Sequence, residues 1–257
     1  ILIPGFLFTL PRALPTFGAY APWLRQQHAK GATVATMCNA AFMLAESGLL
    51  DGRPATTHWA FGELFQRRYP AVSLDTQHIV CDTGSLITSG GATAAMDLLL
   101  HLISRWGSPT LAQTCSKYLL IDPARSAQTP YASWRPMHTH GDDQVLKVQH
   151  WLDKHFAKVV RLDDLAEQFG FGPRNFKRRF KEATGQAPLA YLQGLRLNQA
   201  KRLLESTRMS MEAVTSAVGY EDSNSFRRLF QERVGMAPTA YRRRFQQLPK
   251  METESST

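Results

Sequence analysis

The sequence predicts two domains of different fold class: an α/β domain with a parallel sheet, and an all-α domain with two helix-turn-helix motifs. Three observations lead to this prediction. In the first half, short apolar, β-rich runs alternate with helical patterns, which is typical of a parallel sheet covered by helices. From Asp142 onward the pattern is helical only, and this half contains an internal repeat. The chain of 257 residues is long enough for two separate cores.

The elements of the first half follow in order. ILIPGF, ATVATMC and the segment from HIVCD to SLITSG read as strands, whereas NAAFMLAESGLL and GATAAMDLLLHLISRWG read as helices. After CSKYLLID comes PARSAQTPYASWRPMHTHGDD, rich in Pro, Ser and Thr, which predicts an interdomain linker. We therefore expect a first domain over residues 1–130, a linker over 131–141, a second domain over 142–248 and a disordered tail over 249–257.

Charge is concentrated in the second half. Residues 142–257 hold 20 Lys and Arg against 14 Asp and Glu, whereas residues 1–141 hold 10 against 7. A basic half beside a nearly neutral half indicates an anionic partner, either nucleic acid or a membrane surface, unless the charges form only a solvated surface. No apolar run approaches the roughly 20 residues that a membrane span needs, so a membrane is not expected as a partner.

Cysteine and histidine usage predicts neither a metal site nor a cofactor. Cys38, Cys81 and Cys115 lack Cys-x-x-Cys spacing, which argues against a disulfide framework or a zinc site and favours a reduced, cytoplasmic setting. His138 and His140 lie in the expected linker, where histidines are far more often solvated than bound to metal. No third ligand is evident for them in the sequence.

The internal repeat defines the second domain. The stretch from Leu162, LDDLAEQFGFGPRNFKRRFKEATGQAPLAY, matches the stretch from Met211, MEAVTSAVGYEDSNSFRRLFQERVGMAPTAY. Gly170 recurs as Gly219, one residue closer than the fifty positions that separate the other matches, so the turn in the second copy is one residue longer. These other matches are Phe176 with Phe226, Phe180 with Phe230, Gly185 with Gly235, Pro188 with Pro238 and Tyr191 with Tyr241. Each copy reads as a helix, a Gly-containing turn and a second helix, which predicts a helix-turn-helix.

The second helix of each copy carries the residues that we expect to contact DNA. Its two phenylalanines are four positions apart, so they form one buried stripe. The expected exposed residues are Arg174, Asn175, Lys177, Arg178 and Lys181 in the first copy and Asn224, Ser225, Arg227 and Arg228 in the second. Such side chains can read base edges and phosphates in the major groove. A helical bundle with merely basic surfaces is the alternative, but two such helices at homologous positions favour DNA binding.

Between the copies, LAYLQGLRLNQAKRLLEST predicts a connecting helix with apolar positions at Leu192, Leu195, Leu203 and Leu204. This helix would fix the relative orientation of the two motifs. If both second helices enter successive major grooves on one face of DNA, they lie about 34 Å apart.

Two resemblances extend these predictions. The paired motifs, closed by AVGYEDSNSFRRLFQERVGMAPTAYRRRF, resemble the AraC/XylS transcriptional regulators. This resemblance implies base-reading roles for Arg174, Lys177 and Arg178 and for Asn224, Arg227 and Arg228. The segments LIPGF, ATMCNAAFMLAESGLLDGRPATTHW and ITSGGATAAMDLLLHLISR resemble the PfpI/ThiJ superfamily of class I glutamine-amidotransferase-like domains, which implies a flavodoxin-like, truncated α/β domain. The pairing of the two domains resembles the GlxA group. The likeness begins partway into that domain, so we expect the parent protein to be longer, with its early strands preceding LIPGF.

Cys38 raises the question of catalysis. It follows a strand and opens a helix, a position that suits a nucleophile. The superfamily's enzymes commonly place His after this Cys or use a downstream His-x-Glu; here Asn39 follows, no His-x-Glu occurs, and His58 is the nearest candidate base. We therefore expect a binding crevice at the carboxyl ends of the strands, lined by Gly5, Cys38, Asn39, His58, Thr88 and Ser89. The loop TSGGAT would add free backbone N–H groups for an anion.

The sequence thus predicts a ligand-responsive, DNA-binding transcriptional regulator without catalytic activity. The expected partners are a double-stranded DNA operator and a small-molecule effector, which the resemblance to the GlxA group implies is an amino acid or a quaternary amine. The expected partners also include a second copy of the chain in a homodimer, and RNA polymerase if the chain is an activator. One alternative is a cysteine-dependent hydrolase or amidotransferase-like enzyme fused to a DNA-binding domain. A purely architectural DNA binder is disfavoured, because the α/β half would then have no role.

Overall fold

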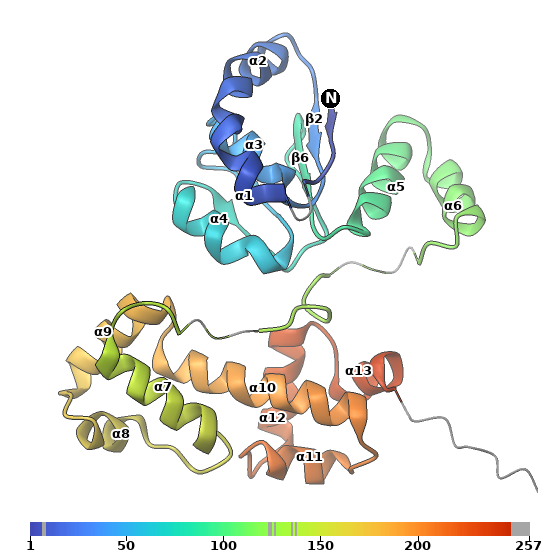
Figure 1. Ribbon diagram of the computed structural model, residues 1–257. Helices are drawn as coiled ribbons and strands as arrows, with labels where there is room; N and C mark the ends of the chain where they lie inside the picture. The colour runs from blue at the N-terminus through green and yellow to red at the C-terminus, as the bar shows by residue number, and fades with distance from the viewer. Residues whose placement is uncertain (7–8, 123–124, 126, 135, 137, 248–257) are drawn as a thin grey trace, which may run out of the picture. The chain divides into compact units, whose positions relative to one another are not determined.

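The computed structural model of the chain describes residues 1–6, 9–122, 125, 127–134, 136 and 138–247. The predicted tail over 249–257 lies outside these residues. By its contacts the chain divides into two compact units, unit 1 with residues 1–132 and unit 2 with residues 133–257 (Figure 1). Each unit has its own hydrophobic core and is described separately.

Unit 1 is built on a four-stranded sheet with the strand order β1-β2-β6-β5. Strands β1 and β2, and β2 and β6, pair in parallel, whereas β5 runs antiparallel to β6. A second, two-stranded parallel sheet is formed by β3 and β4. The strands are β1 (Leu2–Ile3), β2 (Val34–Thr36), β3 (Pro54–Ala55), β4 (Ser73–Leu74), β5 (Val80–Asp82) and β6 (Leu86–Ser89).

The antiparallel edge strand comes from a hairpin inside the segment HIVCD to SLITSG. Its turn contains Gly84, which has a φ of +92°, a value that glycine adopts without steric cost. Asp82 Oδ1 accepts a hydrogen bond of 2.7 Å from the Gly84 amide, and Thr83 N–H donates to the Leu86 carbonyl. The sheet is therefore parallel apart from β5.

Alternation along the central strands directs side chains to both faces of the sheet. Val34 and its register partner Leu86 belong to a core cluster with residues from the helices between β1 and β4. The next pair, Ala35 and Ile87, packs on the other side against α5 through Leu98. Figure 1 shows helices on both sides of β2 and β6, as the α/β prediction requires.

The helices of unit 1 include the two that the sequence predicts, one after β2 and one after β6. The structure adds others that the pattern did not indicate. The helices are α1 (Leu10–Ala13), η2 (Leu14–Thr16), α2 (Phe17–Ala29), η3 (Cys38–Ala40), α3 (Ala41–Glu46), η4 (Trp59–Phe61), α4 (Gly62–Arg68), α5 (Ala94–Trp106) and α6 (Pro109–Tyr118). Those labelled η are short 3₁₀ helices.

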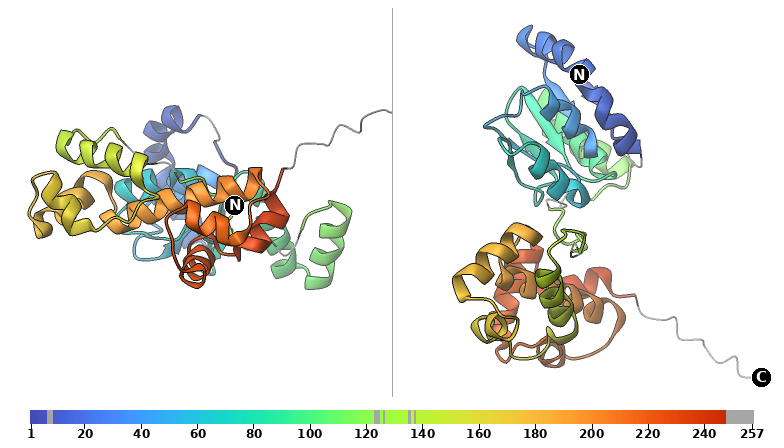
Figure 2. Two further views of the ribbon diagram at one scale, coloured as in Figure 1. Left: turned by 90° about the horizontal axis from the view of Figure 1, so that it is seen from below. Right: turned by 60° about the vertical axis from the view of Figure 1, so that its left-hand side comes forward.

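Within its described residues, unit 2 has helices and no strand (Figure 2). They are α7 (Asp143–His155), α8 (Leu162–Gln168), α9 (Pro173–Thr184), α10 (Pro188–Ser206), α11 (Met211–Ala217), α12 (Ser223–Val234) and α13 (Pro238–Phe245). Part of the expected linker packs on these helices. The Trp134 ring lies 5.1 Å from the Tyr191 ring, centroid to centroid, and against the backbone of Gly194, where an added Cβ would lie 2.8 Å from the indole.

The connecting helix α10 runs from the first group of helices to the second (Figure 1) and contributes to the core of each. Its first part supplies Leu192 and the partly buried Leu195 to the cluster around α7–α9. Its last part supplies Leu204 and the partly buried Leu203 to the cluster around α11–α13. All four apolar positions expected of this helix thus face a core. No helix among the described residues is long and apolar enough to cross a membrane.

Candidate nucleic-acid interface and ligand site

The two helix-turn-helix motifs are α8–α9 and α11–α12. Their turns contain Gly170, with a φ of +72°, and Gly219, with a φ of +83°. Four residues separate α8 from α9 and five separate α11 from α12, so the longer turn predicted for the second copy is confirmed. At Gly219 an added Cβ would lie 2.6 Å from the Ala157 carbonyl oxygen, and the close packing of this turn therefore also requires glycine.

Helices α9 and α12 each bury one face, which carries two phenylalanines, and expose the opposite face. Phe176 and Phe180 are at most 1 % exposed, and so are Phe226 and Phe230. Every side chain that the sequence predicts at the DNA surface is exposed. These residues are Arg174, Asn175, Lys177, Arg178 and Lys181 on α9 and Asn224, Ser225, Arg227 and Arg228 on α12. Their contact with DNA stays a prediction, but the structure gives each helix a polar, cationic outer face.

Some of these cations have partners within the chain. Arg178 Nη1 lies 2.8 Å from Glu182 Oε2, one helical turn away, and its Nη2 donates to Asn175 Oδ1 at 3.0 Å. Both members of the Arg178–Glu182 pair are more than half exposed, so the pair is worth only about 0.3–0.5 kcal/mol. Arg178 can therefore exchange Glu182 for a phosphate or a base edge at small cost.

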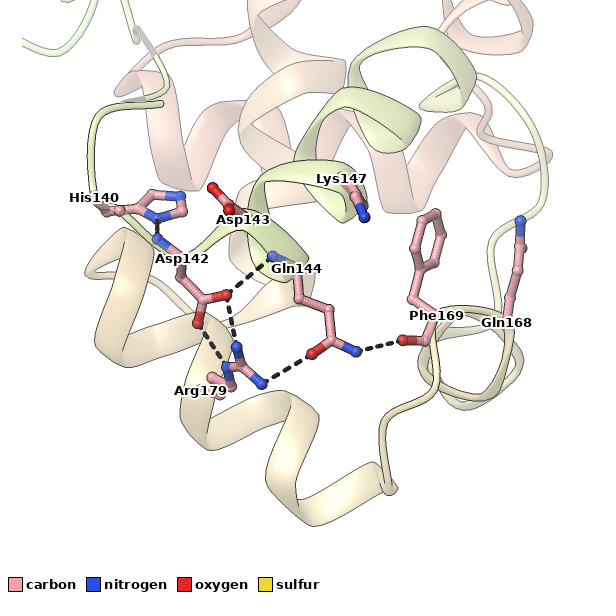
Figure 3. Close-up of a pocket in the computed structure, with 9 residues that line it drawn as sticks. His140, Asp142, Asp143, Gln144, Lys147, Gln168, Phe169 and Arg179 are labelled. Atoms are coloured by element: carbon pink, nitrogen blue, oxygen red, sulfur yellow. Dashed lines mark hydrogen bonds and ion pairs between the residues drawn. The ribbon is translucent and has the colours of Figure 1, made fainter.

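The back of α9 is fixed by a brace that the sequence analysis did not identify. The Arg179 guanidinium donates from Nε to Asp142 Oδ2 at 2.6 Å and from Nη1 to Gln144 Oε1 at 2.9 Å. Gln144 Nε2 in turn donates to the Phe169 carbonyl at 2.7 Å, which reaches the end of α8 (Figure 3). These groups line a pocket of about 830 Å³. Because Asp142, Gln144 and Arg179 are engaged with one another, we interpret this part of the pocket as a structural feature that positions α9 against α7.

Asp142 is also the N-cap of α7, since its carboxylate accepts from the backbone N–H groups of Gln144 and Val145. We expect Asp142→Ala to lower the free energy of unfolding of unit 2 by about 1–2 kcal/mol through loss of the cap. The hydrogen bonds from Arg179 lower the pKa of Asp142. A carboxylate with a depressed folded pKa stabilises above its unfolded pKa of about 4, and this contribution is lost as the pH falls through the folded value.

Urea titrations of the full chain at pH 7 and at acidic pH test this prediction. The matched control is Asp143→Ala, which removes an exposed carboxylate from the first turn of the same helix but no cap. If both variants lower the free energy of unfolding equally, the cap and the hydrogen bonds from Arg179 add nothing beyond the effect of a negative charge in the first turn.

The residues expected to line a crevice come together at the carboxyl ends of β1, β2 and β6. An added Cβ on Gly5 would lie 2.9 Å from Cys38 Cβ, and Asn39 Oδ1 accepts from the Phe6 amide at 2.7 Å. Ser89 Oγ donates to the Thr36 carbonyl at 3.3 Å. Cys38, Asn39, Thr88 and Ser89 are buried. These polar side chains thus bond to the backbone around them.

His58 and Thr88 reach the same edge from neighbouring loops. Thr88 Oγ1 accepts from the Thr56 amide at 2.8 Å, and His58 Nδ1 accepts from the Ala60 amide at 3.0 Å. Gly91 lies against His58, because an added Cβ on Gly91 would be 3.2 Å from His58 Cδ2. Half-buried His58 therefore faces the loop that follows β6.

Gln128 lies beside the residues expected to bind a ligand, and the sequence analysis missed it because it lies in the Pro-, Ser- and Thr-rich segment. Gln128 is buried, with only 4 % of the residue exposed. Both the nitrogen and the oxygen of its side-chain amide form hydrogen bonds. Nε2 donates to the carbonyls of Thr57 and His78 at 2.9 Å, and Oε1 accepts from the Gly91 amide at 3.1 Å. No sequence signal distinguishes it from the polar residues around it.

Both glycine N–H groups of the TSGGAT loop are engaged in hydrogen bonds within unit 1. Gly90 N–H donates to the Ile79 carbonyl at 2.8 Å, and Gly91 N–H donates to Gln128. The amide of Ala94 donates to the Gly91 carbonyl at 2.7 Å. Two of the expected donors are therefore engaged inside the unit, and the anion site at this loop stays a prediction.

Cys38 has the backbone of a strained strand-to-helix turn but the environment of a weak nucleophile. Its φ is +57°, an uncommon conformation for a residue other than glycine. The side chain is buried, and burial raises the pKa of the Cys38 thiol, although a hydrogen bond from the Asn39 backbone partly opposes this. Burial likewise lowers the pKa of His58. Burial thus disfavours the thiolate and the imidazolium alike.

We expect Cys38 to be alkylated by iodoacetamide at pH 8 at least about tenfold more slowly than the half-buried Cys115, because its thiolate fraction and its access are both reduced. Peptide mass spectrometry of the full chain gives the rate at each cysteine. A catalytic thiol would show the opposite order, with Cys38 reacting first.

The two histidines of the expected linker are not simply solvated. His140 Nε2 lies 2.7 Å from Gln149 Oε1. His140 Nδ1 accepts from the Asp142 amide at 3.1 Å, as Figure 3 shows. His138 Nε2 lies 3.0 Å from Asp153 Oδ2 on α7. The expectation of two solvated side chains is therefore wrong, because both pack on unit 2.

Comparisons with known proteins agree with the two units. Residues 1–105 match the DJ-1/PfpI family, and residues 165–244 match a helix-turn-helix domain. The HTH-type transcriptional regulator CdhR of Pseudomonas aeruginosa is 33 % identical over 213 residues, which cover 82 % of this chain and 62 % of CdhR. The HTH-type transcriptional regulator GlxA of Rhizobium meliloti is 27 % identical over 210 residues, which cover 80 % of this chain and 64 % of GlxA.

Among solved structures, the DNA-binding domain of AdpA in complex with a target DNA is 32 % identical, with a TM-score of 0.39 over 40 % of this chain and 92 % of that chain. The chain spans less than two thirds of the length of CdhR and of GlxA. Its two matched segments nevertheless occur in the order of the two structural units. The chain is thus similar to the DJ-1/PfpI family over its first matched segment, to a helix-turn-helix domain over its second, and to HTH-type transcriptional regulators over about four fifths of its length.

Proposed function

We propose that the chain is a sequence-specific DNA-binding transcriptional regulator. The observation that carries this proposal is the pair of cationic helices α9 and α12, exposed on two helix-turn-helix motifs that share α10 within one compact unit. Arg, Lys and Asn on such helices can read base edges in the major groove and hold phosphates. Relatives named as HTH-type transcriptional regulators support the same function. A regulator of this kind acts where DNA is, which places it in the cytoplasm of a bacterial cell.

In this proposal unit 1 senses a small metabolite at the strand ends around Gly5, Cys38, Asn39, His58, Thr88 and Ser89. A half-buried aromatic group supports a quaternary amine as one ligand class: the His58 ring lies 5.4 Å from Trp59 and 5.6 Å from Phe61, centroid to centroid. An amino acid is the other class. The partners that follow are a DNA operator, the effector, a second copy of the chain and, for an activator, RNA polymerase.

Gln128 supports a route from the ligand site to the rest of the chain. It holds the strand-end loops together from the last residues of unit 1, directly before the segment that continues into unit 2. A ligand that changed the loops around His58 and Gly91 would change the contacts of Gln128. Such coupling requires different affinities of the ligand for two states of the protein.

The proposal includes no catalytic role. The raised pKa of Cys38, and the engagement of His58 Nδ1 as an acceptor from the Ala60 amide, argue against a thiolate–imidazolium pair. The DJ-1/PfpI match alone does not decide this question, because one fold can carry many functions. The cysteine-dependent enzyme is therefore the second candidate, and the alkylation order of Cys38 and Cys115 separates the two.

Selection of duplexes from a random pool by the full chain, followed by affinity measurement across a salt series, tests the proposal. A regulator enriches a defined sequence and binds it at least about 10³-fold more tightly than random DNA at physiological salt. Binding that is independent of sequence and merely sensitive to salt would show a polyelectrolyte contact and contradict the proposal.

A further inference from the structure

A cluster of metal-ligating side chains lies on unit 2, away from the outer faces of α9 and α12. His138, which precedes α7, meets His150 and Asp153 on α7, and one ligand atom from each lies within 4.8 Å of the others. The His138 and His150 rings stack, with centroids 5.4 Å apart and planes inclined by 8°. His138 Nε2 and Asp153 Oδ2 are 3.0 Å apart. Three candidate ligands thus converge from two segments of the chain.

The Asp153 carboxylate of this cluster is oriented by a hydrogen bond from a buried tyrosine. Tyr191 on α10 donates from its hydroxyl to Asp153 Oδ1 at 3.0 Å, which leaves Oδ2 on the side of His138. Tyr191 is 1 % exposed and packs between the rings of Trp134 and Phe180. A carboxylate that is oriented by a second hydrogen bond is typical of metal sites, where such outer partners fix the ligand.

The second copy of the motif shows that the histidines are not needed for this packing. There Tyr241 on α13 donates to Glu205 on α10, the helix before the second motif, as Tyr191 on α10 does to Asp153 on α7, the helix before the first. All eight histidines of the chain precede residue 156, so the second copy has the tyrosine–carboxylate pair without imidazoles. The pair is therefore a structural feature of both copies, and the two histidines are an addition specific to the first.

From this geometry we infer that His138, His150 and Asp153 form a binding site for a divalent first-row transition-metal ion such as Zn²⁺. Imidazole nitrogens and a carboxylate oxygen bind Zn²⁺, Ni²⁺, Co²⁺ and Cu²⁺ in preference to Mg²⁺ or Ca²⁺. Neighbouring ligand atoms of a tetrahedral zinc ion are about 3.4 Å apart, so only small side-chain rotations are required.

The site is open to solvent. The side chains of His138 and Asp153 are 32 % and 28 % exposed, and His150 is exposed. An ion can enter directly, and water completes its coordination. On binding it replaces the His138–Asp153 hydrogen bond and fastens the segment before α7 to that helix. This segment continues from unit 1, so the ion would fix the point at which the chain joins the helical unit.

Titration of the metal-free full chain with Zn²⁺ by calorimetry, and with Co²⁺ by visible absorption, tests the inference. We expect one ion per chain, with d–d bands for Co²⁺ and no binding of Mg²⁺. His150→Ala removes an exposed ligand and should weaken Zn²⁺ binding at least about tenfold. His78→Ala is the control, because exposed His78 forms an ordinary pair with Asp75 at 2.9 Å and should leave binding unchanged.

A second pair of variants separates ligation from packing. Tyr191→Phe should weaken Zn²⁺ binding about 10- to 100-fold through loss of the hydrogen bond that orients Asp153. Tyr241→Phe removes the equivalent bond of the second copy and should not change it. The inference is overturned if wild type binds no Zn²⁺ at 1 mM, about the weakest affinity that a specific site would show. It is also overturned if His150→Ala binds as wild type does, or if His78→Ala removes the binding.

Discussion

Replacing Arg178 or Arg228 by Ala is expected to weaken binding of the selected operator by about 1–3 kcal/mol, or about 5- to 150-fold, and to relax base preference at one position. Both side chains are exposed on the outer faces of α9 and α12, four positions or fewer from the buried phenylalanines that fix each helix. The binding free energy lost with a bidentate base contact is larger than the free energy of the weak Arg178–Glu182 surface pair. Because Arg178 and Arg228 lie on different helices, we expect the two variants to relax base preference at different positions of the operator.

Competition binding with the full chain and single-base variants of the operator measures these effects. The control is Arg53→Ala, which removes the same charge from an exposed position of unit 1. If either helix variant lowered affinity equally for all sequences and reduced the salt slope by about one, that arginine would be a phosphate contact and not a base reader.

Truncating the core phenylalanines should have the largest effect on stability. We expect Phe180→Ala and Phe230→Ala each to lower the free energy of unfolding of unit 2 by about 3–5 kcal/mol. Both rings are fully buried. Phe180 lies 5.4 Å from the Tyr191 ring, and Phe230 lies 5.5 Å from the Tyr241 ring, each edge to face. The two substitutions would therefore create equivalent cavities in two separate cores.

Urea unfolding of the full chain, followed by circular dichroism, would show the helical transition at lower urea in both variants. Leu189→Ala on α10 is the control, since Leu189 is 52 % exposed and should change stability by less than about 0.5 kcal/mol. A loss below about 1 kcal/mol for Phe230→Ala would contradict its place in the core of the second motif.

Several features were predictable because they repeat along the chain. Phe176 and Phe180, four positions apart, define the buried stripe of α9, so Lys177 and Arg178 on the opposite side of the helix are exposed. The shift of Gly219 relative to Gly170 gave the longer turn of the second motif. Helix α2 could not be predicted from such a pattern, because only Phe17, Ala21 and Leu24 are buried and Pro22 interrupts the helical sequence.

By itself, therefore, the sequence determined the two fold classes, the paired helix-turn-helix motifs and the polar faces of α9 and α12. Only the tertiary structure decided which polar side chains are engaged. It buried Gln128 among carbonyls from Thr57 and His78 and joined His138 to Asp153. Helical periodicity is a property of neighbouring residues and can be seen along the chain. The partner of a buried amide or imidazole comes from a distant segment, and only the packed chain brings the two together.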